Sequence, residues 1–313
     1  MPNLALGIDV GGSTIQAGLV DSQGEILESL VVPTFKEKGA DYVLKQIVSL
    51  SRQLIQFAGT NLLGLGVALP GEIDCLQGIC LYSPNLKWRN QSISDYLIRE
   101  TGLAVRLVND ANAACLGEYY YGYGKNAPIF LSITLGTGVG SGLILNGKLY
   151  TGRFGSGLEA GHMVIEPYGK KCACGRRGCW ETLVAGPAIV ARTKEALEKS
   201  NTSLLSGKDL TTELIFQAAR QGDCLAEKIV AETIFYLAVG LANLINLFNP
   251  YKISLGGGVS EAEEIVGKRL REKINNYIFP TIRDKVEIYK AKQSYWAGLI
   301  GAASLWLQSH KTH

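Results

Sequence analysis

One pattern occurs twice in this 313-residue chain and limits the folds that the chain can adopt. An apolar strand, a glycine turn and a second apolar strand are predicted at 4–20 and again at 129–145. The turns read Gly11-Gly12-Ser13-Thr14 and Gly136-Thr137-Gly138-Val139-Gly140. Each copy continues through a polar turn into a third strand. Because the copies begin about 125 residues apart, they indicate two related domains rather than a short-period solenoid.

Strands and helices alternate through the rest of the chain. We predict helices at 42–57, 93–100, 112–121, 261–277 and 294–308, several helices within 187–249, and further strands at 63–68, 105–108, 252–255 and 286–289. This alternation indicates an α/β protein with mixed central sheets. The length suits two domains, and no low-complexity linker separates them, so we expect two packed domains around a cleft.

Charge and composition argue against nucleic-acid binding. Thirty-one basic residues face 28 acidic ones, which gives a net charge of only +3. The sequence has no run of five or more lysines and arginines, so it lacks the electrostatic footprint that nucleic acid requires. A hydrophobic fraction of 47% and a charged fraction of 19% are ordinary for a globular protein.

We expect no targeting segment and no membrane span, and therefore a cytoplasmic location. Asp9 interrupts the first apolar run, which is unlike a signal peptide. The most apolar later stretch, 234–248, contains Asn243 and Asn246 and is shorter than the roughly 18–20 residues that cross a bilayer. A buried core helix is the better interpretation of this stretch.

Three of the seven cysteines cluster, and a histidine precedes them. Cys172, Cys174 and Cys179 lie within eight residues, and His162 lies ten residues before the first of them. Three thiolates and one imidazole match a closed, tetrahedral, structural zinc site. The alternative is a cluster of free thiols, whose thiolates the neighbouring basic residues would stabilise. The other four cysteines are scattered, which favours free thiols in a reducing compartment over a disulfide framework.

Three glycine turns follow predicted strands, and the third is Gly256-Gly257-Gly258. Glycine lets backbone N–H groups approach a phosphate closely, and a run of such groups forms an anion-binding nest. One such turn alone is more often a structural hairpin. Three of them at strand ends favour phosphate binding.

Two other nucleotide motifs fail. The segment from Gly7 to Gly12 has P-loop spacing, but Ser13 stands where the lysine belongs, and a strand follows rather than a helix. The segment 122–127 loosely fits a dinucleotide fingerprint, but it follows a tyrosine-rich helix rather than a strand.

A polar cluster, Asn109-Asp110-Ala111-Asn112, lies where a predicted strand ends and a helix begins. Asp and Asn are favoured at helix N-caps, so one interpretation is a cap. The other is a general base, because ligands of α/β proteins bind beyond the carboxyl ends of strands. The two interpretations can hold together.

Further along the chain, Glu159 and His162 are three residues apart and could face the same ligand.

Together these motifs closely resemble the ROK family of repressors, uncharacterised reading frames and sugar kinases, and the resemblance covers nearly the whole chain. Residues 7–14 look like the family's first phosphate motif, 135–140 like the second and 255–260 like its adenosine-side glycines. The sugar-binding signature is matched by Glu159-Ala160-Gly161-His162, and the zinc-loop signature by His162, Cys172, Cys174, Cys179 and Glu181. The glucokinase branch is resembled most by Pro70-Gly71, Ser83-Pro84-Asn85-Leu86 and Asn109-Asp110-Ala111-Asn112.

The resemblance implies the actin-like ATPase fold, in which two ribonuclease-H-like domains surround a cleft for nucleotide and sugar. A sugar and phosphate domain would span 1–117 and be completed by a C-terminal helix at about 291–313. A zinc- and adenosine-binding domain would span 118–290. The family is commonly dimeric or tetrameric, which implies a homo-oligomer.

The resemblance also implies an activity, the ATP-dependent phosphorylation of glucose at its 6-hydroxyl, with Asp110 as catalytic base. The residues implied in sugar binding are Gly71, Asn85, Asn109, Asp110, Glu159, His162 and Glu181. Those implied in ATP binding are Asp9, Gly11, Gly12, Ser13, Thr14, Gly136, Thr137, Gly138, Gly256, Gly257 and Gly258.

Two metals are implied as well. Mg²⁺ would bridge the phosphates, with Asp9 near its water shell. Structural Zn²⁺ would bind His162, Cys172, Cys174 and Cys179. The second ring nitrogen of His162 would then donate to a sugar hydroxyl, in a direction that the zinc fixes.

Two residues depart from the family pattern. Ser13 stands where a threonine is more frequent, and Ser141 stands where glycine is common. Both are small hydroxyl residues that fit beside a phosphate, so the departures bear on nucleotide affinity rather than on the reaction.

Three rival functions remain. The first is a kinase for another hexose, such as N-acetylmannosamine, N-acetylglucosamine, fructose or allose. The second is a sugar-responsive transcriptional regulator. Because the first strand-turn-strand pattern begins at Leu4, we expect no DNA-binding domain ahead of it. The third is an inactive sugar-binding module, which the presence of Asp9, Asp110 and all three glycine turns disfavours.

Overall fold

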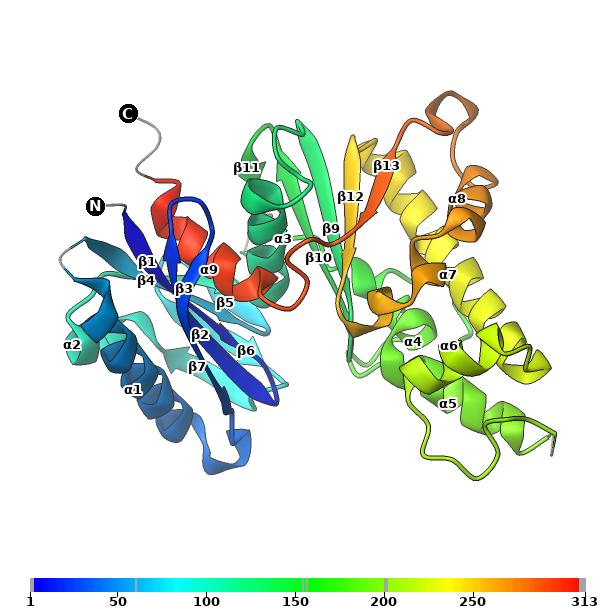
Figure 1. The fold of residues 1–313 in the computed structure, drawn as a ribbon, viewed down its shortest axis with the longest axis horizontal. Helices are drawn as coiled ribbons and strands as arrows, with labels where there is room; N and C mark the ends of the chain where they lie inside the picture. Colours follow the sequence, from blue (N-terminus) through cyan, green and yellow to red (C-terminus); the bar gives the residue numbers. More distant parts are fainter. Residues whose placement is uncertain (1–2, 60, 154, 156, 200–201, 310–313) are drawn as a thin grey trace. The chain divides into compact units, whose positions relative to one another are not determined.

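The computed structural model describes residues 3–59, 61–153, 155, 157–199 and 202–309. Its contacts divide the chain into two compact units (Figure 1). The first unit comprises Met1–Ala127, Gly142–Leu158 and Lys292–His313, and the second comprises Pro128–Ser141 and Glu159–Ala291. These bounds differ from the predicted division at 117/118, because residues 118–127 and 142–158 also belong to the first unit. The cleft stays a prediction.

The first half of the chain carries eight strands and three α-helices among the described residues. These elements are β1 (Leu4–Val10), β2 (Thr14–Asp21), β3 (Ile26–Pro33), η1 (Lys36–Lys38), α1 (Ala40–Ala58), β4 (Leu62–Leu69), β5 (Glu72–Asp74), β6 (Ile79–Ser83), β7 (Trp88–Ser92), α2 (Ser94–Thr101), β8 (Val105–Asn109) and α3 (Asp110–Tyr121).

The second half is richer in helix. Its elements are β9 (Ile129–Leu135), β10 (Val139–Leu145), β11 (Lys148–Leu149), η2 (Ala160–His162), α4 (Glu181–Val184), α5 (Gly186–Leu197), α6 (Thr212–Arg220), α7 (Cys224–Phe248), β12 (Lys252–Gly256), η3 (Gly258–Glu261), η4 (Glu263–Ile265), α8 (Lys268–Asn275), η5 (Pro280–Ile282), β13 (Glu287–Lys290) and α9 (Ala297–Leu307).

Two five-stranded sheets share one topology. The first has the order β3-β2-β1-β4-β8, and the second has the order β11-β10-β9-β12-β13. In the first sheet β1 pairs antiparallel with β2 and parallel with β4, and β8 extends the parallel part. In the second sheet β12 pairs parallel with both β9 and β13, and β11 pairs antiparallel with β10. The predicted duplication of the meander and the mixed α/β class are confirmed.

The side chains of β1 alternate between two layers, as the period of a strand requires. Leu6 and Ile8 join the apolar core that α1 covers. Ala5 belongs to a second core on the opposite face, together with residues of α9, and Asp9 also points toward α9. The first sheet is therefore covered on both faces, by α1 and by α9 (Figure 1).

The closing helix packs on the first unit, as the resemblance implied. It was predicted at 294–308 and is observed at Ala297–Leu307, while residues 310–313 of the implied 291–313 segment lie outside the described residues. Leu299 is fully buried and packs in one cluster with Ala5 and Val20, and α9 also packs against α3.

Two predictions of secondary structure were wrong or incomplete. The helix expected at 261–277 begins only at Lys268, because Gly267 is in an extended conformation and short 3₁₀ turns occupy the preceding residues. The three-stranded sheet β5-β6-β7 was missed. Its last strand consists mainly of exposed polar residues, including Asn90 with a left-handed φ of 47°, so it lacks the alternating apolar pattern of a strand.

The long helix α7 fits the predicted core helix. Among the described helices it is the one long and apolar enough to cross a membrane, and 61% of its most apolar window is buried. It packs against α5, α6 and α8 and thereby organises the helical layer of the second unit.

The packing of α9 leads to a stability prediction. Leu299→Ala removes a fully buried side chain and should lower the free energy of unfolding by about 2–5 kcal/mol. Leu76→Ala is the control, because Leu76 is 100% exposed, and its effect should stay within about 0.5 kcal/mol. Urea unfolding measures both. Equal midpoints for the two variants would contradict the role of α9 in the first core.

Candidate active site

Parallel pairing brings two carboxylates to one edge of the first sheet. The register aligns Asp9 of β1 with Ala68 of β4, and Leu69 of β4 with Asn109 of β8. Asp110 follows directly as the first residue of α3. The carboxyl ends of the three strands therefore meet at one edge, which is where α/β proteins bind ligands.

Both carboxylates have a raised pKa. Burial, with a smaller contribution from the nearby Asp110 charge, raises the pKa of Asp9 to about 7. Burial also raises the pKa of Asp110, although hydrogen bonds from the Ala111 N–H and from Asn109 oppose the shift. Ionising both groups in the ligand-free protein is therefore unfavourable, and a bound cation would favour it.

The first turn of α9 lies against the Asp9 side chain. A Cβ atom on Gly298 would lie 2.2 Å from Asp9 Oδ2, so only glycine permits this approach. Gly298 thus belongs to the support of the site, although it lies far from Asp9 in sequence and no motif identified it.

The cap of α3 is Asn109 rather than Asp110. Asn109 Oδ1 accepts the N–H of Asn112 at 3.1 Å, and its Nδ2 donates to the Gly71 carbonyl at 3.1 Å. Asp110 Oδ1 accepts the adjacent N–H of Ala111 at 2.9 Å, and the Asn109 side chain also donates to the Asp110 carboxylate. This corrects the cap interpretation of Asp110: the neighbouring amide caps the helix and ties down Gly71, which leaves the Asp110 carboxylate available for chemistry.

The first glycine turn is fastened by a residue that no motif contained. Thr34 is fully buried. Its hydroxyl donates to the Gly11 carbonyl at 2.7 Å, and its N–H donates to the Ser13 carbonyl at 2.9 Å. The Gly11 N–H donates to the Thr14 carbonyl and closes the turn. Ser13 and Thr14 are exposed at its tip.

The other two glycine turns lie in the second unit. The Gly136 N–H donates to the Gly138 carbonyl at 3.0 Å, and the Gly136 carbonyl accepts the N–H of Gly186 at the start of α5. Thr137, which lies between Gly136 and Gly138, is exposed. After β12, Gly257 precedes η3, where the Ser260 hydroxyl donates to the Gly257 carbonyl at 2.6 Å. Gly256 is buried at the strand end, whereas Gly258 is exposed.

The sugar-binding signature folds into the short turn η2. Glu159 is exposed, and the His162 side chain is partly buried with 27% exposure. Leu158, just before Glu159, has a φ of 61°, which is a strained conformation of the kind that concentrates at functional sites. Ser141 Oγ accepts the Ala160 N–H at 3.1 Å. The departure from glycine at position 141 therefore gives this turn a hydrogen bond to β10.

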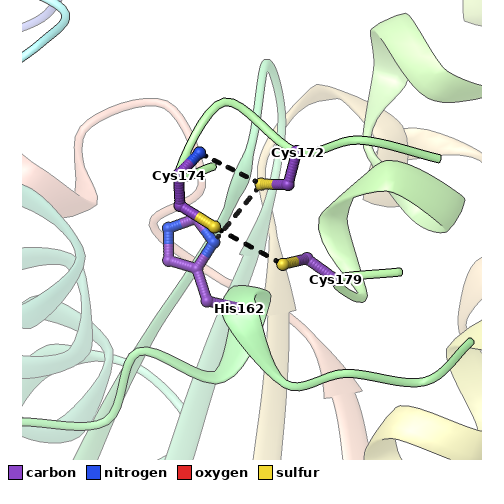
Figure 2. A group of neighbouring side chains, drawn as sticks. All are labelled: His162, Cys172, Cys174 and Cys179. Carbon is purple, nitrogen blue, oxygen red and sulfur yellow. Dashed lines mark hydrogen bonds between the residues drawn. The ribbon is translucent and has the colours of Figure 1, made fainter. Parts of the chain in front are cut away.

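The predicted zinc ligands converge. One donor atom from each of His162, Cys172, Cys174 and Cys179 lies within 4.8 Å of all the others, as a tetrahedral shell of zinc ligands requires (Figure 2). Cys172 Sγ is 3.7 Å from His162 Nδ1, and Cys174 Sγ is 3.6 Å from Cys179 Sγ. The donor set and its spacing fit Zn²⁺.

In the metal-free form, the pKa values of the thiols in this cluster are shifted in opposite directions. Burial and the Glu181 carboxylate raise the pKa of Cys172, whose thiol donates to Glu181 Oε1 at 2.9 Å. Burial opposes ionisation of Cys174, but hydrogen bonds from Arg176 and the neighbouring thiols outweigh it and lower its pKa to about 6. Zinc binding would release the remaining thiol protons.

Glu181 joins the zinc loop to the second glycine turn. Its Oε1 lies 3.5 Å from His162 Nδ1, while a Cβ atom on Gly138 would lie 3.0 Å from its Oε2. In the second unit, the structure therefore groups Glu181 with His162, the thiols and the second glycine turn. In the first unit it groups Gly71, Asn109 and Asp110 with Asp9, while Asn85 is exposed near Gly12.

Sequence reasoning missed how the zinc loop is anchored. Trp180 is fully buried, and its Nε1–H donates to the Tyr236 carbonyl of α7 at 2.9 Å. The Tyr236 hydroxyl donates to Glu166, so one turn of α7 holds both ends of the loop. A Cβ on Gly240 would lie 2.1 Å from the Trp180 ring, so this contact requires glycine. Residues this far apart leave no common motif.

Comparison with known proteins places this geometry in a family. The chain matches the ROK family over residues 5–309. A glucokinase of Thermotoga maritima is 39% identical and covers 97% of this chain and 98% of its own length. A xylose repressor of Bacillus subtilis is 30% identical, covering 96% of this chain and 76% of its own. The crystal structure of a ROK family glucokinase from Streptomyces griseus with glucose and AMPPNP has a TM-score of 0.85 at 34% identity, covering 98% of this chain and 100% of that one.

The duplicated sheets and this structural likeness define a protein of the actin-like ATPase fold, with two ribonuclease-H-like domains, as predicted. Within that class, the chain belongs to the ROK family.

The donor geometry predicts one tightly bound zinc per chain. Elemental analysis of freshly purified, reduced protein should find about one equivalent, because four ligands close the shell. Cys174→Ser removes one ligand and should lose most of this zinc with near-native circular dichroism. Cys224→Ser is the control, since Cys224 is exposed and outside the cluster, and it should retain the metal. Wild-type protein without zinc would contradict the site.

The raised pKa of Asp9 predicts a pH-dependent stability. A carboxyl whose pKa rises on folding stabilises the fold while protonated, and this contribution is lost as the pH rises through about 7. Asp9→Asn cannot ionise. Its free energy of unfolding relative to wild type should therefore grow by roughly 2 kcal/mol between pH 5 and pH 8 in ligand-free protein. Asp95→Asn, at an exposed carboxylate, is the control. A difference independent of pH would show that Asp9 is ionised throughout.

Proposed function

We propose that this protein is a glucokinase that transfers the γ-phosphoryl group of ATP to the 6-hydroxyl of glucose. The observation that carries the proposal is the Asp110 carboxylate, which lies at the start of α3 directly after β8, while the neighbouring Asn109 provides the side-chain cap of this helix. Two similarities support glucose and ATP as the substrates. One is to the ROK family glucokinase structure with bound glucose and AMPPNP, and the other is to the glucokinase relatives.

Asp110 acts as the general base in this proposal. Its carboxylate accepts the proton of the 6-hydroxyl as the oxygen forms a bond to the γ-phosphorus, and the bond from that phosphorus to ADP breaks. Burial raises the pKa of Asp110, which brings it nearer to the range where a carboxylate accepts a proton effectively at neutral pH. Phosphoryl transfer otherwise depends on positioning and charge neutralisation, which the remaining residues provide.

Sugar hydroxyls call for amide, carboxylate and imidazole partners, and both units contain them. In the first unit, Asn85 is exposed near the first glycine turn, while Asn109 holds Gly71 through a hydrogen bond and so shapes the loop. In the second unit, Glu159, His162 and Glu181 form the sugar-binding set. Because the Asn109 amide already binds Gly71 and Asn112, we assign it chiefly to positioning.

The three glycine turns bind the nucleotide. In the first unit, Gly11, Gly12, Ser13 and Thr14 offer backbone N–H groups and hydroxyls to the phosphates. In the second, Gly136, Thr137 and Gly138 do the same, and Gly256, Gly257 and Gly258 lie on the adenosine side. Mg²⁺ would supply charge neutralisation, with Asp9 as the carboxylate near its water shell; the two adjacent carboxyls with raised pKa fit a cation at this edge.

Zinc has a structural part in this proposal. It would hold His162 and the three thiols, and thereby fix the segment that carries Glu181. The chemistry that it supplies is coordination rather than activation of a reacting group, because four protein ligands leave no open position. Loss of zinc in Cys174→Ser should accordingly raise the KM for glucose more than the KM for ATP.

Glucose is proposed over N-acetylmannosamine, N-acetylglucosamine, fructose and allose. A coupled assay of ADP release over this panel, with magnesium present, tests the choice. Turnover with glucose at the highest kcat/KM supports the proposal; preference for another hexose keeps the kinase and replaces the substrate. Absence of ADP release with every hexose would instead favour a regulator or an inactive binding module. A cytoplasmic location and a homodimeric or homotetrameric state complete the proposal.

Removal of the base gives the sharpest prediction. Asp110→Asn keeps the size of the side chain but cannot accept the proton, so kcat should fall by at least about 10²-fold. The KM for ATP should change little. Asp95→Asn is the matched control, because Asp95 also lies in the first turn of a helix in the same unit. A near-normal kcat in Asp110→Asn, measured by ADP release, would remove Asp110 from the mechanism.

A further inference from the structure

The first glycine turn has no cationic side chain of its own. Ser13 occupies the position that lysine takes in a P-loop. A triphosphate carries several negative charges, and kinases commonly place a lysine or arginine on them because charge builds up on the transferred group. A lysine or arginine side chain at this turn must therefore come from another segment of the chain.

Lys36 reaches the turn from the segment after β3. A Cβ atom on Gly12 would lie 3.6 Å from Lys36 Nζ, so the ammonium group sits directly over the backbone of Gly12. Thr34, two residues earlier, is hydrogen-bonded to the carbonyls of Gly11 and Ser13. The turn and the segment that carries Lys36 are thus joined by a buried residue.

The charge of Lys36 is available for a ligand. Within the described residues, no carboxylate forms an ion pair with it, whereas other lysines of the chain do form such pairs. Its neighbour Lys38 is occupied differently. The Lys38 ammonium lies 4.6 Å from the ring centre of Phe35 and 4.5 Å from that of Tyr42. Only one of these two lysines therefore faces the phosphate turn.

The position of Asn85 indicates which phosphate Lys36 would meet. A Cβ on Gly12 would also lie 4.0 Å from the Cβ of Asn85, which is assigned to the sugar. Gly12 therefore has the lysine and the sugar-side residue as joint neighbours. The group that lies between donor and acceptor in a kinase is the one transferred.

We propose that the Lys36 ammonium binds the γ-phosphoryl group of ATP and remains with it during transfer to the sugar, an inference that rests on the proposed function. Lys36 forms no covalent bond. It donates hydrogen bonds to the non-bridging oxygens while the bond to ADP breaks and the bond to the 6-hydroxyl oxygen forms, and the hydroxyl proton goes to Asp110.

Comparing the affinities of AMPPNP and ADP distinguishes a contact between Lys36 and the γ-phosphate from a general effect of the lysine charge, because only AMPPNP carries a third phosphoryl group. Isothermal titration calorimetry with magnesium would compare AMPPNP and ADP on wild type, Lys36→Ala, Lys36→Arg and Lys38→Ala. Lys36→Ala should weaken AMPPNP about 10- to 100-fold, the range for a hydrogen bond between charged groups, and change ADP by less than about twofold. Lys36→Arg should recover most of the loss, and Lys38→Ala should match wild type.

The same variants in the ADP-release assay provide a second measurement. Lys36→Ala should lower kcat at least about tenfold with the KM for glucose nearly unchanged, because the contact strengthens as charge develops. Circular dichroism confirms folding of each variant.

Three outcomes would overturn the inference. Equal weakening of AMPPNP and ADP would move Lys36 away from the γ-phosphate, and equal behaviour of the two alanine variants would leave it without a phosphate contact. In both cases an active wild type keeps the proposed function intact. Wild-type protein that binds neither nucleotide and releases no ADP would overturn the proposed function and this inference together.

Discussion

Parallel pairing of β1, β4 and β8 sets the position of the reactive groups in the first unit. Because the backbone hydrogen bonds align the three strands, Asp9 and the residue that follows β8 come to one edge without any direct bond between them. The α9 face of the sheet then buries the first carboxylate and raises its pKa. A site that favours neutral acids when empty is well prepared to receive a cation together with a polyphosphate.

The second unit reaches the same end by different means. Its zinc-cluster residues lie from η2 to the start of α4, a segment in which the described residues form isolated β-bridges rather than strands. A candidate zinc cluster, a buried tryptophan and one turn of α7 support that segment. A loop with this many independent supports would lose little conformational freedom on binding a sugar, which would lower the cost of binding.

Much of this arrangement was predictable from the sequence, since the decisive signals are local. Glycines after apolar strands, three cysteines within eight residues and a polar cluster at a strand end each report on their own surroundings. Such patterns placed the duplicated strand-turn-strand units and the convergence of His162 with the three cysteines. Local chemistry alone could not divide the roles of Asn109 and Asp110, because both residue types are favoured as caps and only the hydrogen bonds separate them.

What escaped prediction depends on contacts between distant parts of the chain. Trp180 packs against Gly240, and Asp9 packs against Gly298. In the sequence, each of these contacts is visible only as a single glycine within a helix, and such glycines occur for many other reasons. The position of Lys36 was equally unpredictable, because a single lysine after a strand forms no recognisable sequence pattern. The strands β5 to β7 were missed for a related reason: β5 has only three residues and β7 is mostly exposed and polar, so their pairing with β6 defines them rather than their own pattern.

The two sheets invite a comparison, position by position, of what each copy has kept. β1 and β9 have the same length and both lead into a glycine turn, so Asp9 in the first corresponds to Thr134 in the second. One copy has an acid at the next-to-last position of its strand and the other has a neutral hydroxyl. Thr134 adds no charge to the second turn, whereas Asp9 can ionise beside a bound cation. Repetition of a scaffold thus supplies two similar cradles, and the difference of a single side chain makes them unequal in charge.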